Sequence, residues 1–252
     1  YRIDNKFTNF SFNCTEFKEE CGKENIVLYG DTQALQYFPS LENTLEYKKI
    51  DIYFSKECSL FKNINLFSFT NLIDFKKKKL ACENLKSDFF DKLMNSKIDK
   101  IILAFWYNSY INKKIFLDQD NKFITQKDTK INKLFYELDE FIKILPANKI
   151  YLVLPIPEFL HSADVCIINK KNCYKTQKNY FKFYQIIQQK FLELQKGNES
   201  LEVINLHNLL CDKKLSTCSM IDKNNKLIYR DKENIGVNNI NTITLEFKKI
   251  LK

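Results

Sequence analysis

The 252-residue sequence contains few of the residues that end helices and strands and form turns, with only four glycines and four prolines. It therefore has no Pro/Gly/Ser-rich linker, and it also has no internal repeat, so we expect one domain over residues 1–252. Hydrophobic residues make up 44% of the chain and aromatic residues 14%, which is enough for a substantial core at this length.

Long hydrophobic runs are also missing. No apolar stretch approaches the roughly 20 residues that a membrane-spanning helix needs. The residues from Tyr1 onward lack the charged, apolar and small-residue regions of a signal peptide. If the protein is exported, we expect this chain to be a mature form or a soluble part of a longer polypeptide.

Histidine is scarce, whereas cysteine is not. The eight cysteines contrast with two histidines, His161 and His207, neither of which stands where it would complete a zinc knuckle. Three cysteine pairs have the same spacing of six intervening residues, and Cys58 and Cys82 remain. These pairs are Cys14 with Cys21, Cys166 with Cys173, and Cys211 with Cys218. We therefore expect four local disulfides, an oxidising compartment, and neither a metal nor another cofactor.

The net charge of +9 comes mostly from lysine. Two interpretations stay open: the lysines form a solvated surface, or they attract an anionic glycan, lipid or nucleic acid. The only dense run, Lys76–Lys79, has no interleaved arginine and aromatic residues. We do not interpret it as a nucleic-acid patch and expect no nucleic-acid partner.

Five short segments rich in β-branched and aromatic residues are typical of buried strands. They are residues 26–29, 50–54, 101–105, 150–154 and 201–206. Helical spacing recurs between or after them, over residues 35–45, 129–145, 174–195 and 241–251. This alternation predicts an α/β fold, a three-layer α/β/α sandwich with a mainly parallel five-stranded sheet. The residues before Ile26 are polar and predicted to be irregular, and residues 55–85 form an excursion.

In a parallel sheet, ligands collect beyond the carboxyl ends of the strands. The first such junction is the turn Gly30-Asp31-Thr32-Gln33. Gly30 permits a tight turn, and the free N–H groups of the following helix start could hold an oxyanion close to the Thr32 hydroxyl. The alternative is that Asp31 or Thr32 only caps the helix.

A second motif, Tyr229-Arg230-Asp231-Lys232-Glu233-Asn234, precedes the last predicted helix. Together with the turn at Gly30, it resembles the SGNH hydrolase superfamily, in particular the extracytoplasmic SGNH domain of membrane acyltransferase-3 proteins, which O-acylate surface sugars. The family's Trp at a strand end and its Pro-x-Pro segment have counterparts in Trp106 and in Pro155-Ile156-Pro157. The resemblance spans nearly the whole chain. It implies an SGNH or flavodoxin-like fold. From the cysteine pairs themselves, we expect one disulfide to pin residues 1–25 and another to hold residues 55–85.

The departures from this family concern the catalytic groups. The family's nucleophilic serine corresponds to Thr32, and its basic histidine corresponds to Asn234, with Asp231 in the place of the residue that orients the histidine. An amide cannot accept a proton at neutral pH. Loss of the histidine lowers kcat by a factor on the order of 10⁶ in a serine hydrolase. Thr32, Asp231, Asn234 and Asp31 are therefore candidate catalytic positions in which the reaction is impaired.

Four residues are candidates for substrate binding: Gln33, Trp106, Asn108 and His161. Trp106 could stack on a sugar ring or lie in the core. Asn108 could donate to an oxyanion or cap a loop. His161 and His207 each follow a predicted strand, and each is either a replacement base or an ordinary loop histidine.

Three functions remain open. The resemblance implies an extracytoplasmic, membrane-tethered partner of a membrane acyltransferase domain, and the altered motifs favour a role in binding the glycan acceptor. The first alternative is an active acyl-transferring or ester-hydrolysing domain with Thr32 as nucleophile. The second is a structural extracellular domain without a ligand.

Overall fold

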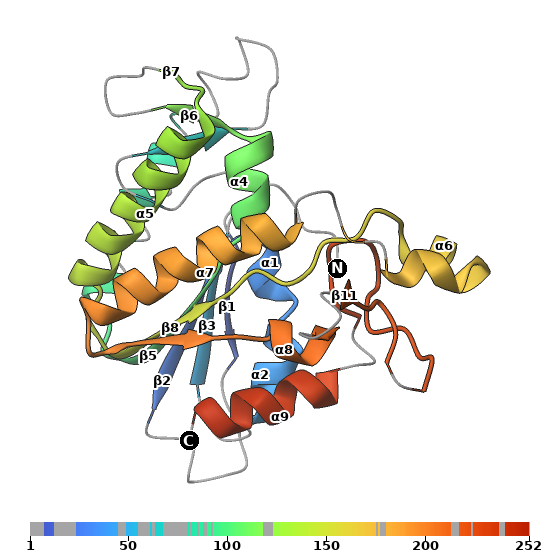
Figure 1. Cartoon of the computed structure of the whole chain (residues 1–252). Helices are drawn as coiled ribbons and strands as arrows, with labels where there is room; N and C mark the ends of the chain where they lie inside the picture. The colour runs from blue at the N-terminus through green and yellow to red at the C-terminus, as the bar shows by residue number, and fades with distance from the viewer. Residues whose placement is uncertain are drawn as a thin grey trace, which may run out of the picture. The chain divides into compact units, whose positions relative to one another are not determined.

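The structure is a computed structural model, drawn in Figure 1. The residues that it describes are 8–12, 24–44, 49–54, 61, 64–67, 80–117 apart from 81, 85, 88, 89 and 92, 123–174, 176, 180–212, 217–236 apart from 223, and 240–251. Among them, no helix is long and apolar enough to span a bilayer. The lysine run Lys76–Lys79 lies outside the described residues.

The main sheet has six strands in the order β1-β3-β2-β5-β8-β9. Their bounds are β1 Thr8–Phe12, β2 Asn25–Gly30, β3 Lys49–Phe54, β5 Ile98–Ala104, β8 Ala147–Val153 and β9 Leu201–Ile204. Strand β2 pairs in parallel with both β3 and β5. The five predicted strands and the α/β class are therefore confirmed.

Strand β1 corrects, for residues 8–12, the prediction that the residues before Ile26 are irregular. It pairs antiparallel with β3, and Phe10 lies opposite Ile52. An edge strand needs a hydrogen-bonding partner on one side only, so a short segment with polar flanks can form one without a strong apolar pattern.

A second, three-stranded sheet involves the segment that was predicted as an excursion. Strand β4 (Asn65–Phe67) pairs with β6 (Ile115–Leu117), which pairs with β7 (Phe123–Ile124), both antiparallel. The predicted excursion thus contributes a strand to a sheet whose other members lie about 50 residues later in the sequence.

The chain divides into two compact units. The first contains residues 1–32 and 47–151, and the second contains residues 33–46 and 152–252. Each unit is described separately below. The expectation of one domain over residues 1–252 stays a prediction.

Strand β2 and the residues around it form the core of the first unit. Ile26 to Tyr29 are almost completely buried, as are Ile101 to Ala104 of β5. Helix α5 (Lys127–Ile144) packs on this sheet, and its Phe141 ring lies 5.2 Å from the Tyr29 ring and 6.5 Å from the Phe61 ring. Aromatic rings therefore join the sheet to the helix that the periodicity over residues 129–145 predicts.

The second unit contains two helix contacts, visible in Figure 1. Helix α2 (Phe38–Thr44) packs against α9 (Ile240–Ile250), where the rings of Tyr37 and Phe247 meet at 6.0 Å. Helix α7 (Tyr180–Lys196) packs against β9. The helix predicted over residues 35–45 is interrupted, because α1 (Thr32–Leu35) ends before Pro39, which lacks the N–H that an unbroken helix would need.

Two of the predicted disulfides are present, Cys166–Cys173 and Cys211–Cys218. The second one joins β10 (Cys211–Asp212) to β11 (Thr217–Cys218), in which the two cysteines face each other across an antiparallel pair. Each of these bridges links cysteines that are close in the sequence, as the equal spacing predicts.

The other two predicted disulfides fall partly or wholly on residues that the structure does not describe. Cys82 is disulfide-bonded, but its expected partner Cys58 lies outside the described residues. Cys14 and Cys21 also lie outside them, although they are the third pair with the shared spacing. The bridge from Cys14 to Cys21 and the pairing of Cys58 with Cys82 therefore stay predictions.

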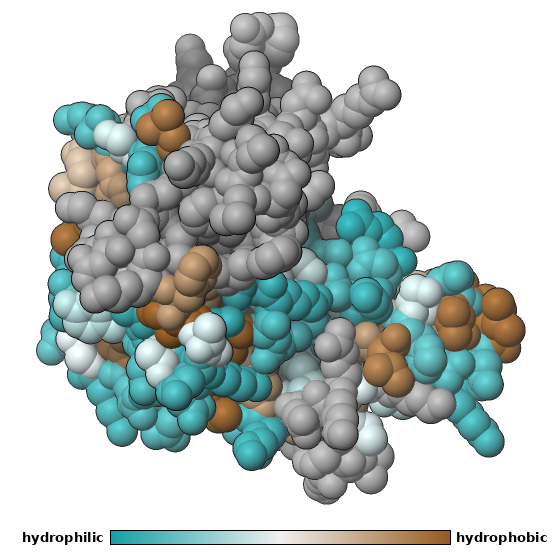
Figure 2. All heavy atoms as spheres, turned by 90° about the horizontal axis from the view of Figure 1, so that it is seen from above, coloured by the Kyte–Doolittle hydropathy of each residue, from teal (hydrophilic) through white to brown (hydrophobic). Residues whose placement is uncertain are grey.

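Hydrophobic side chains reach the surface over helix α6 (Ala163–Ile168). Ile167 and Ile168 are 66% and 85% exposed, and the brown group on the right of Figure 2 marks this region. The Cys166–Cys173 disulfide closes the segment that contains them. The exposed isoleucines thus lie at the end of a helix, in a segment whose conformations are restricted by a disulfide.

Candidate functional site

The turn Gly30-Asp31-Thr32-Gln33 lies where the sequence places it, at the carboxyl end of β2. Gly30 is the last residue of the strand, and its neighbours across the sheet are Phe54 and Ala104. Thr32 is half-buried and is the first residue of α1. This is the edge of a parallel sheet at which ligand sites form.

Asp31 is buried and serves as an anchor inside the first unit. Its Oδ2 accepts a hydrogen bond of 2.7 Å from the backbone N–H of Trp106. Burial, the Asp31 charge and a hydrogen bond with Asp31 raise the pKa of Tyr110 well above its ordinary value. Asp31 thus joins the turn after β2 to the turn after β5, a positioning role that its sequence motif alone does not reveal.

Trp106 and Asn108 lie at the start of helix α4 (Tyr107–Lys113) and are both half-buried. The Lys113 ammonium lies 4.3 Å from the centre of the Trp106 ring, a cation–π contact. The Asn108 Oδ1 accepts a hydrogen bond from the Asn112 amide one turn later. Their roles in binding a sugar or an oxyanion stay predictions.

The second motif is folded tightly around Asp231 in the second unit. Its Oδ1 accepts hydrogen bonds of 2.8 Å from the backbone N–H groups of Glu233 and Asn234. The Asn234 side-chain nitrogen lies 3.0 Å from each oxygen of the Asp231 carboxylate. The Asp-x-x-Asn spacing thus places the Asn234 amide within hydrogen-bonding distance of the Asp231 carboxylate. The histidine of a triad makes a similar hydrogen bond to its aspartate.

The charge of Asp231 is stabilised by these contacts. Burial by itself would raise the pKa of Asp231, but hydrogen bonds from Glu233 N–H, the Asn234 side chain and Asn234 N–H, with the charge of Arg230, lower that pKa below its ordinary value. Asp231 is therefore an anion at neutral pH.

Tyr229 fixes the start of this motif. Its side chain is fully buried, and its hydroxyl donates a 3.0 Å hydrogen bond to the carbonyl of Pro157. Its ring meets the Phe159 ring edge-on at 4.8 Å. The Phe159 N–H also donates to the Lys232 carbonyl at 2.8 Å. The Pro-x-Pro segment and the Tyr-Arg-Asp motif, about 70 residues apart, are thus in contact.

A chain of amide side chains runs from Gln33 to this motif, all within the second unit. The Gln33 Nε2 lies 3.4 Å from the Asn234 Oδ1 and from the Glu233 carbonyl. The Gln33 Oε1 accepts a hydrogen bond from Gln36, whose own Oε1 accepts one of 2.9 Å from the Ile235 N–H. Gln36 was not a sequence candidate, because a single amide in a helical segment carries no motif.

The contacts of Asn234 limit its chemistry. Its amide N–H groups face the Asp231 carboxylate, and its oxygen faces the Gln33 amide. A neutral amide has no lone pair that takes a proton at physiological pH. Asn234 is thus a hydrogen-bonding residue in a network that connects Gln33 to the second motif.

The two histidines have different surroundings. His161 is half-buried in the loop before α6, and its imidazole has no hydrogen bond to any described residue. Its role as a replacement base or substrate-binding residue stays a prediction.

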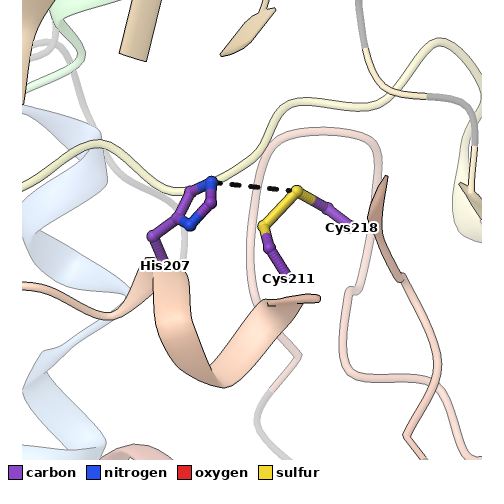
Figure 3. A group of neighbouring side chains, drawn as sticks. All are labelled: His207, Cys211 and Cys218. Carbon is purple, nitrogen blue, oxygen red and sulfur yellow. Dashed lines mark hydrogen bonds between the residues drawn. A yellow bond between two sulfur atoms is a disulfide. The ribbon is translucent and has the colours of Figure 1, made fainter. Parts of the chain in front are cut away.

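His207 begins α8 (His207–Leu210) and is buried. Its ring stacks on Tyr184 with the ring centres 4.0 Å apart. Figure 3 shows its Nε2 pointing toward the Cys211–Cys218 disulfide, 4.0 Å from the Cys218 sulfur. One imidazole nitrogen and the two sulfurs lie within 4.8 Å of one another, but the sulfurs are bonded to each other. Because a thiolate is the form of cysteine that binds metals, this disulfide offers no such ligand.

Comparison with known proteins identifies the fold. Residues 7–234 match the model of the SGNH domain fused to AT3 domains. The periplasmic domain of a lipopolysaccharide acetyltransferase from Salmonella ser. Paratyphi A is 14% identical, with a TM-score of 0.64 over 92% of this chain and 87% of that chain. A candidate platelet activating factor from Streptococcus pneumoniae is 16% identical, with a TM-score of 0.53 over 93% of this chain and 86% of that chain.

A search of curated proteins finds no sequence match. The low identities of the two solved structures mean that their similarity shows the fold alone. The family match, by contrast, rests on the sequence of residues 7–234, which includes the turn at Gly30 and ends at Asn234. This chain therefore belongs to the family of SGNH domains that are fused to AT3 domains.

Proposed function

We propose that this domain serves a membrane O-acyltransferase that modifies extracytoplasmic carbohydrate, and that it binds the glycan acceptor rather than transferring the acyl group itself. The family match supports the partnership, because these SGNH domains are fused to AT3 domains. The structurally similar Salmonella protein is the periplasmic domain of a lipopolysaccharide acetyltransferase.

One observation carries the catalytic part of the proposal. The Asn234 amide is engaged by Asp231 on one side and by Gln33 on the other, and the proposal assigns this residue to the family's histidine position. A general base must accept the proton of the nucleophilic hydroxyl, and this amide cannot. Thr32 consequently lacks the activation that the family's serine receives.

The disulfides support an extracytoplasmic location. Disulfides persist in the periplasm and at the cell surface and are rare in a reducing cytosol. Cys166–Cys173 and Cys211–Cys218 are both formed here, and no described cysteine is a free thiol. The domain is accordingly proposed to act on the outer side of the membrane, tethered through its AT3 partner.

Thr32 as an active nucleophile is the second candidate. It is favoured by the position of Thr32, which directly follows the carboxyl end of strand β2 and Asp31. The hydrogen bond from the Trp106 N–H to Asp31 also holds this turn in place. The candidate needs a base other than Asn234, and His161 is the residue proposed for it.

Incubation with p-nitrophenyl acetate separates the two candidates. We expect no burst of p-nitrophenol and no acyl adduct on Thr32, because no base deprotonates its hydroxyl. Intact-mass measurement of the protein after incubation, with peptide mapping, checks both points.

Thr32→Ala is the matched control. A mass increase of one acetyl group on Thr32 that disappears in Thr32→Ala would overturn the acceptor-binding proposal and establish the second candidate. A His161→Ala variant then shows whether that histidine is the base, since the adduct should form on the order of 10²-fold more slowly without it.

A further inference from the structure

A hollow in the second unit is lined by residues that belong to neither of the two motifs described above. Its volume is about 300 Å³, at the lower end of the range of roughly 300–1,000 Å³ that is common for small-molecule sites. Helix α7 lines one side, and the segment that follows β9 lines the other. The lining residues are Phe181, Tyr184, Gln185, Gln188, Asn205, His207, Asn208 and Asp212.

The inner wall of the hollow is rigid and aromatic. The Tyr184 and His207 rings stack at 4.0 Å and 22°, and the Phe181 ring meets His207 edge-on at 6.0 Å. Behind His207 lies the Cys211–Cys218 disulfide, as Figure 3 shows. A covalently closed loop and a ring stack therefore hold the wall in one conformation without a ligand.

Asn205 presents a fixed amide to the hollow. Its Oδ1 accepts two hydrogen bonds of 3.0 Å, one from the Tyr184 hydroxyl and one from the backbone N–H of His207. These bonds identify which end of the amide is the oxygen, and they leave the two N–H donors of Asn205 for another acceptor. Burial raises the pKa of Tyr184 to about 12, although its bond to Asn205 lowers it, so this hydroxyl remains a donor.

Three further amides border the hollow: Gln185, Gln188 and Asn208. Phe181, Tyr184, Gln185 and Gln188 follow the spacing of one helix face. In the described part of the chain, the three amide side chains make no hydrogen bond to another residue. Each supplies two donors and an acceptor, a combination that matches hydroxyl groups, which both donate and accept.

The charge of the hollow restricts its ligand. Among its lining residues the only carboxylate is Asp212, and neither lysine nor arginine lines it. A phosphate, sulfate or uronic acid would meet neither lysine nor arginine there and would meet the Asp212 carboxylate. The preferred ligand is uncharged and has several hydroxyl groups and one apolar face.

We propose that this hollow, defined by α7 and the β9–α8 segment, binds one neutral pyranose residue of a glycan. Phe181 and Tyr184 supply ring surface for the apolar C–H face of the sugar, and the four amides with Asp212 supply partners for its hydroxyl groups. The choice of a sugar over other polyhydroxylated ligands rests on the proposed function. The hollow itself rests on the described geometry.

The test is a titration of the ¹⁵N-labelled 252-residue chain with the methyl pyranosides of glucose, galactose, mannose and N-acetylglucosamine, followed by NMR. We expect at least one of them to shift the side-chain amide signals of Gln185, Gln188, Asn205 and Asn208. Methyl glucuronoside, which differs from methyl glucoside by its carboxylate, should bind at least about tenfold more weakly than a sugar that binds.

Variants locate the binding. Gln185→Ala/Gln188→Ala should raise the Kd at least about tenfold, because it removes two amide partners of the sugar. Gln189→Ala is the matched control, since it removes the same side chain from the same helix outside the hollow. Tyr184→Phe should weaken binding about threefold by releasing Asn205 while keeping the ring.

Two results would overturn the proposal that this hollow binds a neutral pyranose. One is the absence of shifts with every neutral pyranoside up to about 50 mM, far above the millimolar Kd that a few hydrogen bonds give. The other is an unchanged Kd in the double variant. If larger glycans bind elsewhere and Thr32 stays unacylated, the pocket fails while the proposed function stands. An acyl adduct on Thr32 would instead remove the proposed function without affecting the titration.

Discussion

At the scale of single residues, our proposal assigns Asn234 to the place of the family's histidine, where an amide can keep the contact with Asp231 but cannot accept a proton. The Asn234 amide reaches both oxygens of Asp231 at 3.0 Å, so a donor at this position still pairs with the carboxylate. In a triad, the aspartate orients the imidazole and stabilises its positive charge after proton transfer. With an amide there, no imidazolium forms for Asp231 to stabilise.

Restoring the two family residues tests this interpretation. We expect the variant Thr32→Ser/Asn234→His to hydrolyse p-nitrophenyl acetate with kcat/KM raised on the order of 10²-fold, since a base then accepts the serine proton. Each single variant should gain much less, because nucleophile and base act as a unit. Equal rates for the double variant and the original protein would contradict this account of Asn234.

A second prediction concerns the charge of Asp231. Its pKa is lowered in the fold, so its contribution to stability is present above the unfolded-chain pKa of about 3.9 and is lost as the pH falls through the folded value. Asp231→Ala should lower the free energy of unfolding at pH 7 by on the order of 1 kcal/mol, allowing for screening of this partly exposed group.

Urea unfolding at pH 7 and at decreasing pH measures this effect. The difference between Asp231→Ala and the original protein should shrink below a pH of about 3.9. Asp139→Ala is the control, because Asp139 lies on the surface of α5 in an ion pair with Lys143. A surface pair of that kind contributes about 0–1 kcal/mol, and a larger effect of Asp139→Ala than of Asp231→Ala would contradict the prediction.

At the scale of elements, the two described disulfides close loops of the same length in different settings. Each joins cysteines seven positions apart. Cys166–Cys173 connects α6 to the 3₁₀ helix η1 (Lys170–Tyr174), whereas Cys211–Cys218 connects β10 to β11 beside His207. Loop-closure entropy alone thus predicts equal contributions to stability.

Replacing each pair by alanine separates entropy from local structure. We expect both double variants to lose about 2 kcal/mol of stability. Only Cys211→Ala/Cys218→Ala should also change the environment of His207, because that imidazole lies 4.0 Å from the Cys218 sulfur. Thermal unfolding gives the first quantity, and the NMR signals of the His207 ring give the second. If those signals shifted only in the Cys166→Ala/Cys173→Ala variant, the contact between His207 and the Cys211–Cys218 disulfide would be contradicted.

At the scale of the whole molecule, the domain is interpreted as one part of a membrane enzyme. We expect the complete polypeptide to fractionate with membranes through AT3 segments and to expose this domain on the oxidising side. Its cysteines should react with maleimide only after reduction. Membrane fractionation with thiol labelling checks both points, and thiols that are labelled without reductant would contradict the location.

The fold class was predictable because its strands are short apolar segments. Ile26 to Tyr29 and Ile101 to Ala104 are almost completely buried, as expected for central strands of a parallel sheet. The composition of these segments, and their alternation with helical segments along the chain, were therefore sufficient to predict the fold class. Strand β1 and the β4-β6-β7 sheet were not predicted, because backbone pairing between distant segments leaves little trace in either segment alone.

The candidate site was likewise predictable from the sequence only in part. The sequence by itself determined the turn at Gly30, the Asp231–Asn234 spacing and the two described local cysteine pairs, since each depends on residues close together in the chain. Only the tertiary structure decided that Gln33 and Gln36 contact the second motif, and that Tyr184, Asn205 and His207 share one hollow. These contacts join residues separated by about 20 to 200 positions, and the folding of the backbone, not local propensity, brings them together.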